Sequence, residues 1–461
     1  MLSRLDIFIV IGYFIMMALV GVIASKKASK SLDAYYLGGR NIPWYVLGVS
    51  GMATFIDISG TAFLVAYFYI LGLKGYWVCY QGAVALVLAF LMIFTGKWIN
   101  RSGVMTNAEW MIFRFGNARQ GQLARILSAV SVLIVAVFFI SYFYVGLSKV
   151  LPDYLPLFSG PNAGQYTALA IFGLIMVYTA LSGFYGVVYT DMLQAIVILG
   201  VIIFIASKAV MIATPEYFAA NGAGPETGWL ELVPSNWTEM SSWQFQMPEG
   251  YKSMESLGPL LVVWLIANIM QGFATPFDAW TSQRFYAAKS ERESSLVAFQ
   301  WIVLFSLRFP LMLGFAVLAL QIGGQISDPE MAITRVVQVL IPAGLKGVVV
   351  AALLAAAMST ADSIINSSAA YLVNDIYRPF LNPGASASRL AGASYLTTIV
   401  IICTGVVIGL GTETITEVWG WIVMGLFTGM LIPNILKWFW WRFNGVGYAG
   451  GMVAGIVSAV L

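Results

Sequence analysis

Histidine is absent from this sequence, and cysteine occurs only twice. Without histidine the chain has no zinc–histidine site, no Ser-His-Asp triad and no histidine proton relay. Cys79 and Cys403 both lie inside apolar runs, so neither a disulfide framework nor a thiolate metal site is expected. Most familiar enzyme mechanisms thereby lose their general base or their metal, and we expect that the protein is not an enzyme.

Charged residues are also scarce, at 10% of the 461 residues, whereas roughly 25% of the residues in an ordinary soluble protein are charged. Hydrophobic residues make up 60% and occur in runs of roughly 20, the length that a helix needs to cross about 30 Å of hydrocarbon. The net charge of +3 is too small to indicate nucleic acid as a partner. The sequence therefore predicts an all-α polytopic membrane protein that has the lipid bilayer as its solvent.

The apolar runs predict the order of the spans within one transmembrane domain, 1–461. Hydropathy gives twelve spans, which begin near Ile7, Trp44, Tyr76, Ile126, Thr167, Val187, Leu257, Leu296, Gly347, Tyr395, Val418 and Val446. We divide the chain into an extra helix, 7–24, a first repeat, 44–213, an external loop, 214–256, a second repeat, 257–436, and an extra C-terminal helix, 446–461. The first run lacks a cleavage pattern, so we interpret it as a retained helix rather than a signal peptide. The last run stops without a polar cap, so we expect either that the natural protein is longer or that this chain is truncated.

The basic residues predict the orientation, because cytoplasmic loops carry an excess of lysine and arginine. One set of alternate loops holds Lys26, Lys27, Lys30, Arg40, Lys97, Arg101, Arg114, Arg119, Arg125, Arg284, Lys289, Arg292, Arg378, Arg389, Lys437 and Arg442. The other set, together with the N-terminus, holds Arg4, Lys74, Lys149, Lys252, Arg335 and Lys346. We therefore expect a protein of the cell membrane, plasma or inner, with its N-terminus outside. Arg308 fits neither set, because it falls near the middle of the eighth span.

Spans two to six and seven to eleven form two sets of five, and an odd number of crossings places the two sets in opposite topology. The first span of each set contains helix-interrupting residues, which are Gly48, Gly51, Ser59 and Gly60 in one and Gly272 and Pro276 in the other. Matching interruptions indicate a binding site at mid-membrane, because backbone groups exposed there need an ion, a solute, water or another helix. The alternative is an ordinary bundle that uses glycines to pack its helices closely.

Three motifs carry a resemblance to a known family. The ninth span runs from Gly344 to Tyr377 and contains AAAMSTADS at 355–363. It resembles the signature helix of the sodium:solute symporter family, which includes sodium-coupled sugar, proline, sialic acid and monocarboxylate carriers. The stretches GFYGVVYTDMLQ at 183–194 and QRFYAAKS at 283–290 are similar to the family's fifth core helix and to the loop after its sixth. The resemblance covers nearly the whole chain. It implies the five-plus-five inverted-repeat symporter fold with one extra N-terminal helix.

A sodium site is predicted where this signature helix faces the first core helix. Ala356, Ser359 and Thr360 lie at i, i+3 and i+4, so one carbonyl and two hydroxyls share a helical face, and neutral oxygens suit a small hard cation. The resemblance implies two further carbonyl ligands, those of Phe55 and Ile58. The alternative is that both hydroxyls bond their own preceding carbonyls or a neighbouring helix.

Three aspartates, Asp57, Asp191 and Asp362, lie within or beside spans, where an unpaired carboxylate is costly. Asp191 matches an aspartate that binds a second sodium in some family members, and Ser359 and Ser363 match the hydroxyls that join it. Asp362 would strengthen this second site or replace it. The alternative for Asp191 is a structural cap at the cytoplasmic start of its helix.

Arg308 is the main candidate for contacting the solute. A guanidinium cannot discharge by losing its proton, so it needs an anion, and a carboxylate on the solute would serve. Asp57 resembles an acidic residue of the proline carriers and would either tune the sodium site or pair with Arg308. The other solute-binding candidates are Gln81, Tyr142, Asn268 and Gln271. A sugar is not favoured, because Ala62 stands where the sugar carriers have a glutamine.

The sequence therefore predicts a sodium-coupled secondary active symporter that imports a small organic solute by alternating access. Its partners would be sodium, the solute and the bilayer. A rival hypothesis is a transporter-like sensor module of a longer signalling protein. An integral-membrane enzyme is disfavoured, because the cytoplasmic loops show no metal cluster and no nucleophile with a base beside it.

Overall fold

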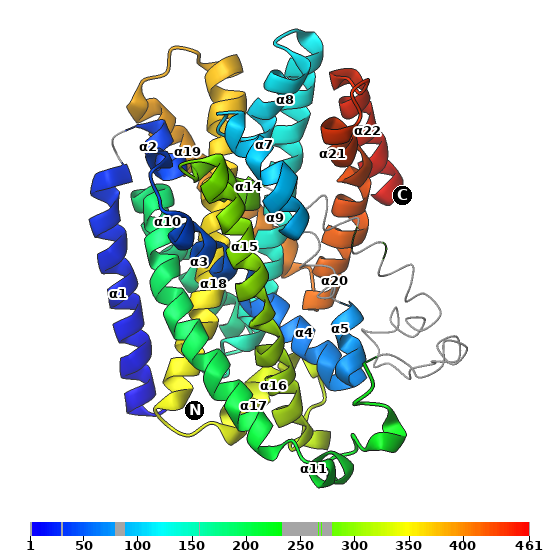
Figure 1. The fold of residues 1–461 in the computed structure, drawn as a ribbon. Coiled ribbons are helices and arrows are strands. Elements are labelled where there is room, and N and C mark those ends of the chain that lie inside the picture. The colour runs from blue at the N-terminus through cyan, green and yellow to red at the C-terminus, as the bar shows by residue number, and fades with distance from the viewer. Residues whose placement is uncertain are drawn as a thin grey trace.

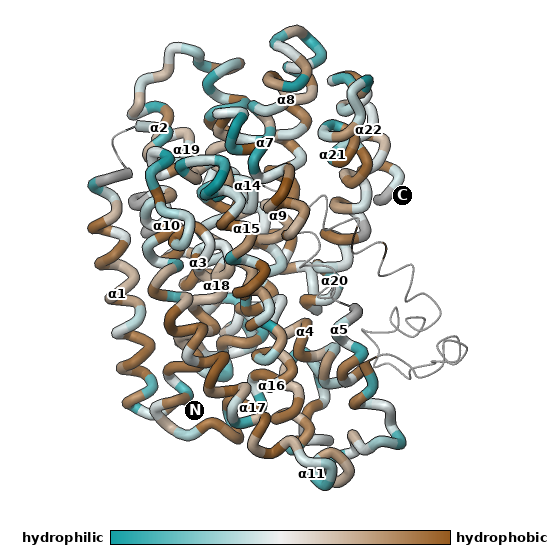
Figure 2. The backbone as a smooth tube through the Cα atoms, viewed as in Figure 1, coloured by the Kyte–Doolittle hydropathy of each residue, from teal (hydrophilic) through white to brown (hydrophobic). Residues whose placement is uncertain are grey.

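The computed structural model describes residues 2–28, 31–78, 88–155, 157–232 and 279–460, together with Ile266 and Ile269. These residues form a bundle of long helices whose axes are roughly aligned (Figure 1). Apolar residues fill the middle of the bundle, and hydrophilic residues gather at both ends (Figure 2). Within the described ranges the only strand-like pairing is an isolated bridge between Ile42 and Ala288, so the predicted all-α class is confirmed.

Helices of very different lengths make up the bundle. They are α1 (Arg4–Ala28), α2 (Leu32–Leu37), α3 (Trp44–Phe55), α4 (Ile58–Leu71), α5 (Gly75–Val78), α7 (Gly96–Arg101), α8 (Asn107–Phe115), α9 (Arg119–Val150), α10 (Ala163–Ile212), α11 (Pro215–Ala220), α14 (Ala279–Ala287), α15 (Glu291–Ser306), α16 (Arg308–Leu320), α17 (Ala332–Leu340), α18 (Leu345–Ala370), α19 (Ala387–Leu410), α20 (Ile415–Gly420), α21 (Thr428–Phe439) and α22 (Gly445–Val460). Three π-helical stretches are Leu91–Thr95, Tyr371–Leu381 and Trp421–Phe427.

Seven of the described helices are long and apolar enough to cross a membrane, and the bent pair α3 and α4 makes an eighth. Helix α10 holds two of the expected spans, joined at a bend where Gly183 has φ 54° and ψ −159°. A Cβ at Gly183 would also lie 2.8 Å from the Tyr35 carbonyl oxygen, so the bend requires glycine. Residues 79–87 of the expected span near Tyr76, nearly all of the expected span near Leu257 and the greater part of the external loop lie outside the described residues.

The break between α3 and α4 bends the pair by 61° at Ile56 and Asp57. Asp57 is the N-cap of α4: its carboxylate accepts a hydrogen bond from the Gly60 amide at 2.5 Å, and its carbonyl accepts one from the Thr61 hydroxyl at 2.6 Å. Both residues at the break have ordinary negative φ angles. The sequence analysis placed the helix break in the right span but attributed it to glycines. In the structure a capping aspartate, and not a glycine, starts the second half-helix.

The expected breakers Gly48 and Gly51 lie inside regular α3 and allow α15 to pack against it. A Cβ at Gly51 would lie 2.1 Å from the Trp301 ring, and one at Gly48 would lie 2.0 Å from the side-chain oxygen of Gln300. These two glycines therefore serve close helix packing, which was the alternative interpretation.

Helix α18 is the buried centre of the bundle, and all its residues from Val349 to Ala370 are buried. Its N-terminus is capped by Asp6 of α1, whose carboxylate accepts hydrogen bonds from the amides of Gly344 at 2.7 Å and Gly347 at 2.6 Å. The extra N-terminal helix thus fixes where the signature helix begins.

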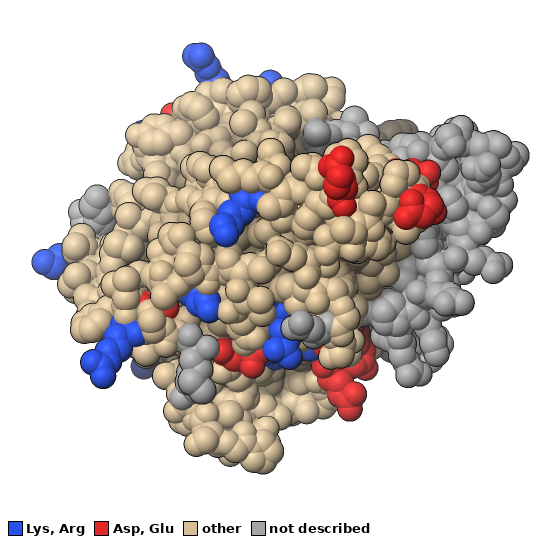
Figure 3. All heavy atoms as spheres, turned by 90° about the horizontal axis from the view of Figure 1, so that it is seen from below, with Lys and Arg blue, Asp and Glu red and all other residues tan. Residues whose placement is uncertain are grey.

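The two ends of the bundle differ in the segments that they carry. Helix α8 and the connection between α18 and α19 lie at the end opposite the N-terminus (Figure 1). Seen from below, the end with the N-terminus is mostly uncharged, with scattered basic and acidic side chains (Figure 3). Helix α8 and the connection between α18 and α19 carry some of the arginines that were predicted to be cytoplasmic. Those segments therefore lie at the end of the bundle opposite the N-terminus.

We expect Gly51→Ala to destabilise the protein by about 1–3 kcal/mol, because a methyl group there overlaps the rigid Trp301 ring. The measurement is the thermal unfolding of the purified protein in detergent. Gly200→Ala is the matched control, because Gly200 lies in α10 with no other atom within 4 Å of its added Cβ. Equal unfolding temperatures for the two variants would contradict this packing role.

Candidate functional site

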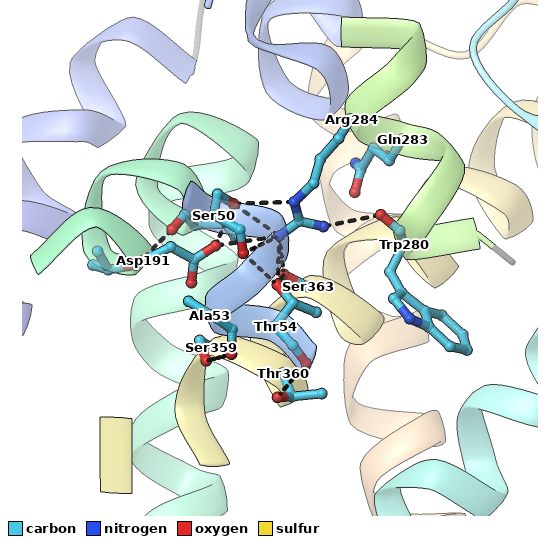
Figure 4. Close-up of polar contacts among 12 residues, drawn as sticks. Ser50, Ala53, Thr54, Asp191, Trp280, Gln283, Arg284, Ser359, Thr360 and Ser363 are labelled. Atoms are coloured by element: carbon cyan, nitrogen blue, oxygen red, sulfur yellow. Dashed lines mark hydrogen bonds and ion pairs between the residues drawn. The ribbon is translucent and has the colours of Figure 1, made fainter. Parts of the chain in front are cut away.

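The last turn of α3 lies against the middle of α18, where the sequence predicts the sodium site. The Ser359 hydroxyl donates to the carbonyl oxygens of Ala53 at 3.0 Å and Ala356 at 3.2 Å. The Thr360 hydroxyl donates to those of Thr54 at 2.8 Å and Ala356 at 3.0 Å. Three carbonyl and two hydroxyl oxygens from two helices therefore converge on one buried region (Figure 4).

This set of oxygens has the chemistry that a sodium ion requires. All five oxygens are neutral, and if each hydroxyl proton turned away from its carbonyl, every one would present a lone pair to a cation. Ser359 and Thr360 bond both their own helix and α3, as the alternative interpretation expected. The expected ligands Phe55 and Ile58 lie next to the break, but the carbonyls that the hydroxyls contact are those of Ala53 and Thr54.

A second polar cluster surrounds Arg284 of α14, whose side chain is 1% exposed. Its Nη2 donates to the Thr54 hydroxyl at 2.6 Å, the Ser363 hydroxyl at 3.0 Å and Asp191 Oδ2 at 3.2 Å. Its Nε and Nη2 both donate to the Ser50 hydroxyl, at 3.1 and 2.8 Å, and its Nη1 donates to the Trp280 carbonyl at 2.9 Å. One guanidinium thereby joins α3, α10, α14 and α18 (Figure 4).

Arg284 corrects the sequence analysis, which counted it among the arginines of the cytoplasmic loops. The signal that could have found it was Asp191, because a carboxylate inside a spanning helix needs a positive partner. Asp191 Oδ2 accepts from Arg284 and also from the Ser50 hydroxyl, at 2.5 Å. These hydrogen bonds go to side chains of α3 and α14 and not to helix amides, so they do not support the alternative interpretation of Asp191 as a helix cap.

Asp362 and Ser363, the other residues expected at a second sodium site, are also buried in this region. Ser363 contacts the guanidinium directly, whereas Asp362 acts on it through its charge. The extra helix α1 reaches the same region: the Tyr13 hydroxyl accepts a hydrogen bond from Gln194 at 3.1 Å and donates to the Met358 sulfur at 3.5 Å. Gln194 lies three residues after Asp191 on α10, and Met358 directly precedes Ser359.

A third group of polar side chains lies on the other side of the break, around Gly60. A Cβ built on Gly60 would be 2.6 Å from Asp57 Oδ2 and 3.1 Å from both Arg308 Nη2 and the Tyr142 hydroxyl. Asp57 and Arg308 are each 9% exposed, and Tyr142 is 1% exposed. The structure therefore brings together three of the expected solute-contacting residues, from α4, α9 and α16.

Arg308 differs from Arg284 in how its guanidinium is satisfied. Its charge acts on Asp57, yet no salt bridge between the two is present in the described part of the chain, and Arg308 Nε has no hydrogen-bond partner there. Aromatic rings line the neighbourhood: the ring centroids of Tyr142 and Trp419 are 5.5 Å apart, and those of Phe139 and Trp280 are 5.0 Å apart. The candidates Gln81, Asn268 and Gln271, and the breakers Gly272 and Pro276, lie outside the described residues.

Comparison with known proteins gives a consistent result. The model of the sodium:solute symporter family matches residues 35–455. The chain is 27% identical to a sodium/glucose cotransporter of Vibrio parahaemolyticus, over 100% of this chain and 85% of that protein. It is 26% identical to a high-affinity proline transporter of Bacillus subtilis, over 96% of this chain and 89% of that protein.

Solved structures share the fold. A sodium-coupled sialic acid symporter, solved in a substrate-bound outward-open state, superposes with a TM-score of 0.74 at 19% identity, over 99% of this chain and 98% of that one. A nucleobase-cation-symport-1 family transporter in a closed conformation gives a TM-score of 0.53 at 13% identity, over 92% of each chain.

We expect Gly60→Ala to abolish solute transport, because the methyl group would push apart Asp57, Arg308 and Tyr142. The predicted sodium site lies on the other side of the break, so stabilisation of the protein by sodium should persist. The measurements are gradient-driven uptake in proteoliposomes and thermal unfolding with and without sodium. Gly12→Ala in α1, where an added Cβ meets no atom within 4 Å, is the matched control. Unchanged uptake by Gly60→Ala would contradict a solute site at this position.

Proposed function

Because the chain belongs to the sodium:solute symporter family, we propose that it couples the entry of sodium to the uptake of a small organic solute that carries a carboxylate. The family and the apolar helices establish a multi-pass membrane transporter that uses sodium, and not an enzyme. We infer the carboxylate on the solute from Arg308. Its side chain is buried beside the helix break, and its Nε has no hydrogen-bond partner among the described residues.

Sodium binds between α3 and α18 in this proposal. The ligands are Ala356, Ser359 and Thr360 of α18 and two carbonyls beside the break, either those of Ala53 and Thr54 in the last turn of α3 or those of Phe55 at the end of α3 and Ile58 at the start of α4. An ion held there replaces the hydrogen bonds between the two helices by shared coordination. Sodium drives transport only if it binds the outward, solute-competent state more tightly than the other states.

The solute binds on the other side of the break in this proposal. Its carboxylate pairs with Arg308, and its remaining atoms lie near Tyr142, Asp57 and the surrounding aromatic rings. Gln81, Asn268 and Gln271 stay candidates for further polar contacts. The two sites share the α3–α4 break, so binding at one affects the backbone that forms the other.

We further propose that the protein lies in the cell membrane with its N-terminus outside and with repeats at 44–213 and 257–436. The support is the distribution of basic residues along the sequence, with Arg284 now excluded from the cytoplasmic set.

Replacing both Ser359 and Thr360 by alanine should raise the sodium concentration for half-maximal binding by at least about tenfold, since contacts to charged groups are each worth roughly 1.5–3 kcal/mol. The measurement is sodium-dependent thermal stabilisation of the purified protein. Ser367→Ala is the matched control, because Ser367 is buried on the same helix and bonds only its own helix, at 3.1 Å. A wild-type sodium response in the double variant would refute the primary site.

Arg308→Gln should weaken uptake of carboxylated solutes by about 10- to 100-fold, because it removes the charged partner of the carboxylate. The measurement is uptake of a labelled panel of carboxylic acids, amino acids and their neutral amides, driven by a sodium gradient. Sodium should still stabilise the variant, and Arg335→Gln, an exposed arginine, serves as the control. A wild type that carries only neutral solutes, with Arg308→Gln still active, would exclude the anchoring role.

A further inference from the structure

We propose that a pocket at the end of the bundle opposite the N-terminus binds the headgroup of one anionic phospholipid. The pocket has a volume of about 320 Å³ and lies where α7, α8 and the end of α21 approach one another (Figure 1). Its lining includes Trp98 and Arg101 of α7, Trp110, Phe113 and Arg114 of α8, and Trp438 of α21. None of these residues belongs to the proposed sodium site or solute site, and lipid binding here is a property separate from transport.

Arg114 supplies a positive charge to the pocket, and it forms no salt bridge with any described carboxylate. Its Nε donates to the Lys437 carbonyl at 3.1 Å and its Nη2 to the Trp440 carbonyl at 3.2 Å, both at the end of α21. These carbonyls hold the guanidinium in place but carry only partial charges. Its Nη1 makes no hydrogen bond to a described residue. The guanidinium is therefore fixed at the pocket with N–H groups to offer to an anion.

Arg101 supplies a second positive charge, which it shares with Glu291 of α15. Its Nε and Nη2 donate to the two carboxylate oxygens at 2.9 and 2.6 Å, and both side chains are exposed. The lining of the pocket contains both arginines and, among the described residues, no carboxylate. Two arginines against Glu291 leave one net positive charge, and a phosphodiester carries one negative charge. Guanidinium groups suit phosphate because they present paired N–H groups to two of its oxygens.

Three tryptophans form the apolar wall of the pocket. The ring of Trp438 stacks with that of Trp98 at a centroid distance of 6.2 Å, and its centroid lies 4.0 Å from that of Trp110. Tryptophan is enriched at the level of the lipid headgroups, because its ring is apolar and its N–H is polar. In the orientation proposed above, this end of the bundle faces the cytoplasmic leaflet, which carries anionic lipids.

A row of exposed aromatic rings continues from this wall. Phe94 lies one helical turn before Trp98, nearer to the middle of the bundle, and the two ring centroids are 6.1 Å apart. The ring of Phe439 is also 6.1 Å from that of Trp98. Phe94 and Phe439 are 42% and 47% exposed, so their rings offer apolar surface to acyl chains. A soluble phosphate has no group to bury there, and the occupant is therefore a phospholipid and not a free phosphate ion.

Lipid binding to the purified full chain in detergent, measured by native mass spectrometry, tests the proposal directly. The wild type should bind phosphatidylglycerol at least about fivefold more tightly than phosphatidylcholine, which has no net charge, and Arg101→Gln should lose about that factor for phosphatidylglycerol. Arg389→Gln, an exposed arginine in the first turn of α19, is the matched control and should bind as the wild type does. Equal affinity of the wild type for both lipids, or wild-type binding by Arg101→Gln, would overturn the proposal.

Glu291→Gln separates lipid binding from a purely structural role of Arg101. If Arg101 served only the contact between α7 and α15, removing the carboxylate would leave lipid binding unchanged. In this proposal the substitution removes a competitor of the phosphate, so phosphatidylglycerol should bind about fivefold more tightly. Unchanged or weaker binding by the folded variant would contradict the lipid site. Arg101→Gln combined with Arg114→Gln should abolish the preference for phosphatidylglycerol.

A competition experiment distinguishes a lipid from a free phosphate. Inorganic phosphate and glycerol 3-phosphate at millimolar concentration should leave phosphatidylglycerol bound, because they lack acyl chains to bury against Phe94 and Phe439. Full displacement by either one would identify a site for soluble phosphate and would overturn the choice of a lipid. Added choline chloride should weaken phosphatidylglycerol binding by the wild type, since salt screens exposed charges, and should have less effect on the variant that lacks both arginines. An equal effect of salt on the two proteins would count against a site made by these arginines.

Discussion

A helix that ends inside a membrane leaves carbonyl groups that no water can reach, and these groups need hydrogen-bond donors or a cation from the protein's own interior. The need to satisfy them organises the centre of the molecule. Helix α3 ends at Phe55, and the carbonyls of Ala53 and Thr54 in its last turn accept the hydroxyls of Ser359 and Thr360. This contact between α3 and α18 gives the carbonyls of α3 hydrogen-bond donors and gives the buried hydroxyls of α18 acceptors. The same contact collects neutral oxygens at one point, so a solution to the backbone problem is also a suitable place for a cation.

The two buried arginines of the site illustrate how hydrogen bonding separates structural from ligand-binding charges. Every nitrogen of Arg284 has a partner on a described residue, whereas Arg308 Nε has none there. A fully satisfied guanidinium gains little from a ligand, because it would exchange one set of hydrogen bonds for another. A guanidinium with an unpartnered N–H gains a new hydrogen bond from the ligand without losing an existing one. The same residue type therefore fixes a helix interface on one side of the break and is available to an anion on the other.

The fold class and the family were predictable from the sequence, because span length, charge scarcity and the motif at 355–363 are local properties of the chain. The position of the break was only partly predictable. The glycines of this span suggested the break, yet the break is made by Asp57, which caps the first turn of α4. This cap can be recognised only when the start of α4 is known. The partnership of Asp191 with Arg284 was missed, because 93 residues separate them and the arginine was counted as a loop residue. Pairings across a bundle depend on which helices become neighbours, and periodicity alone does not report that.

The extra helix α1 adds a constraint that the repeat architecture alone would lack. Asp6 caps the start of α18, and Tyr13 contacts Met358 in the middle of α18 and Gln194 on α10. Helices α1 and α18 are therefore joined at two levels, and α10 is joined to α1 at the second, which opposes sliding or rotation of α18. By contrast, the contacts that Ser359 and Thr360 make with α3 at the sodium site are hydroxyl-to-carbonyl bonds. Bonds of this kind are individually weak and are the ones that an ion can replace. It follows that the two hydroxyl contacts between α3 and α18 are the ones an ion can rearrange, while Arg284 continues to join α3 to α10 and α18 through Thr54, Asp191 and Ser363.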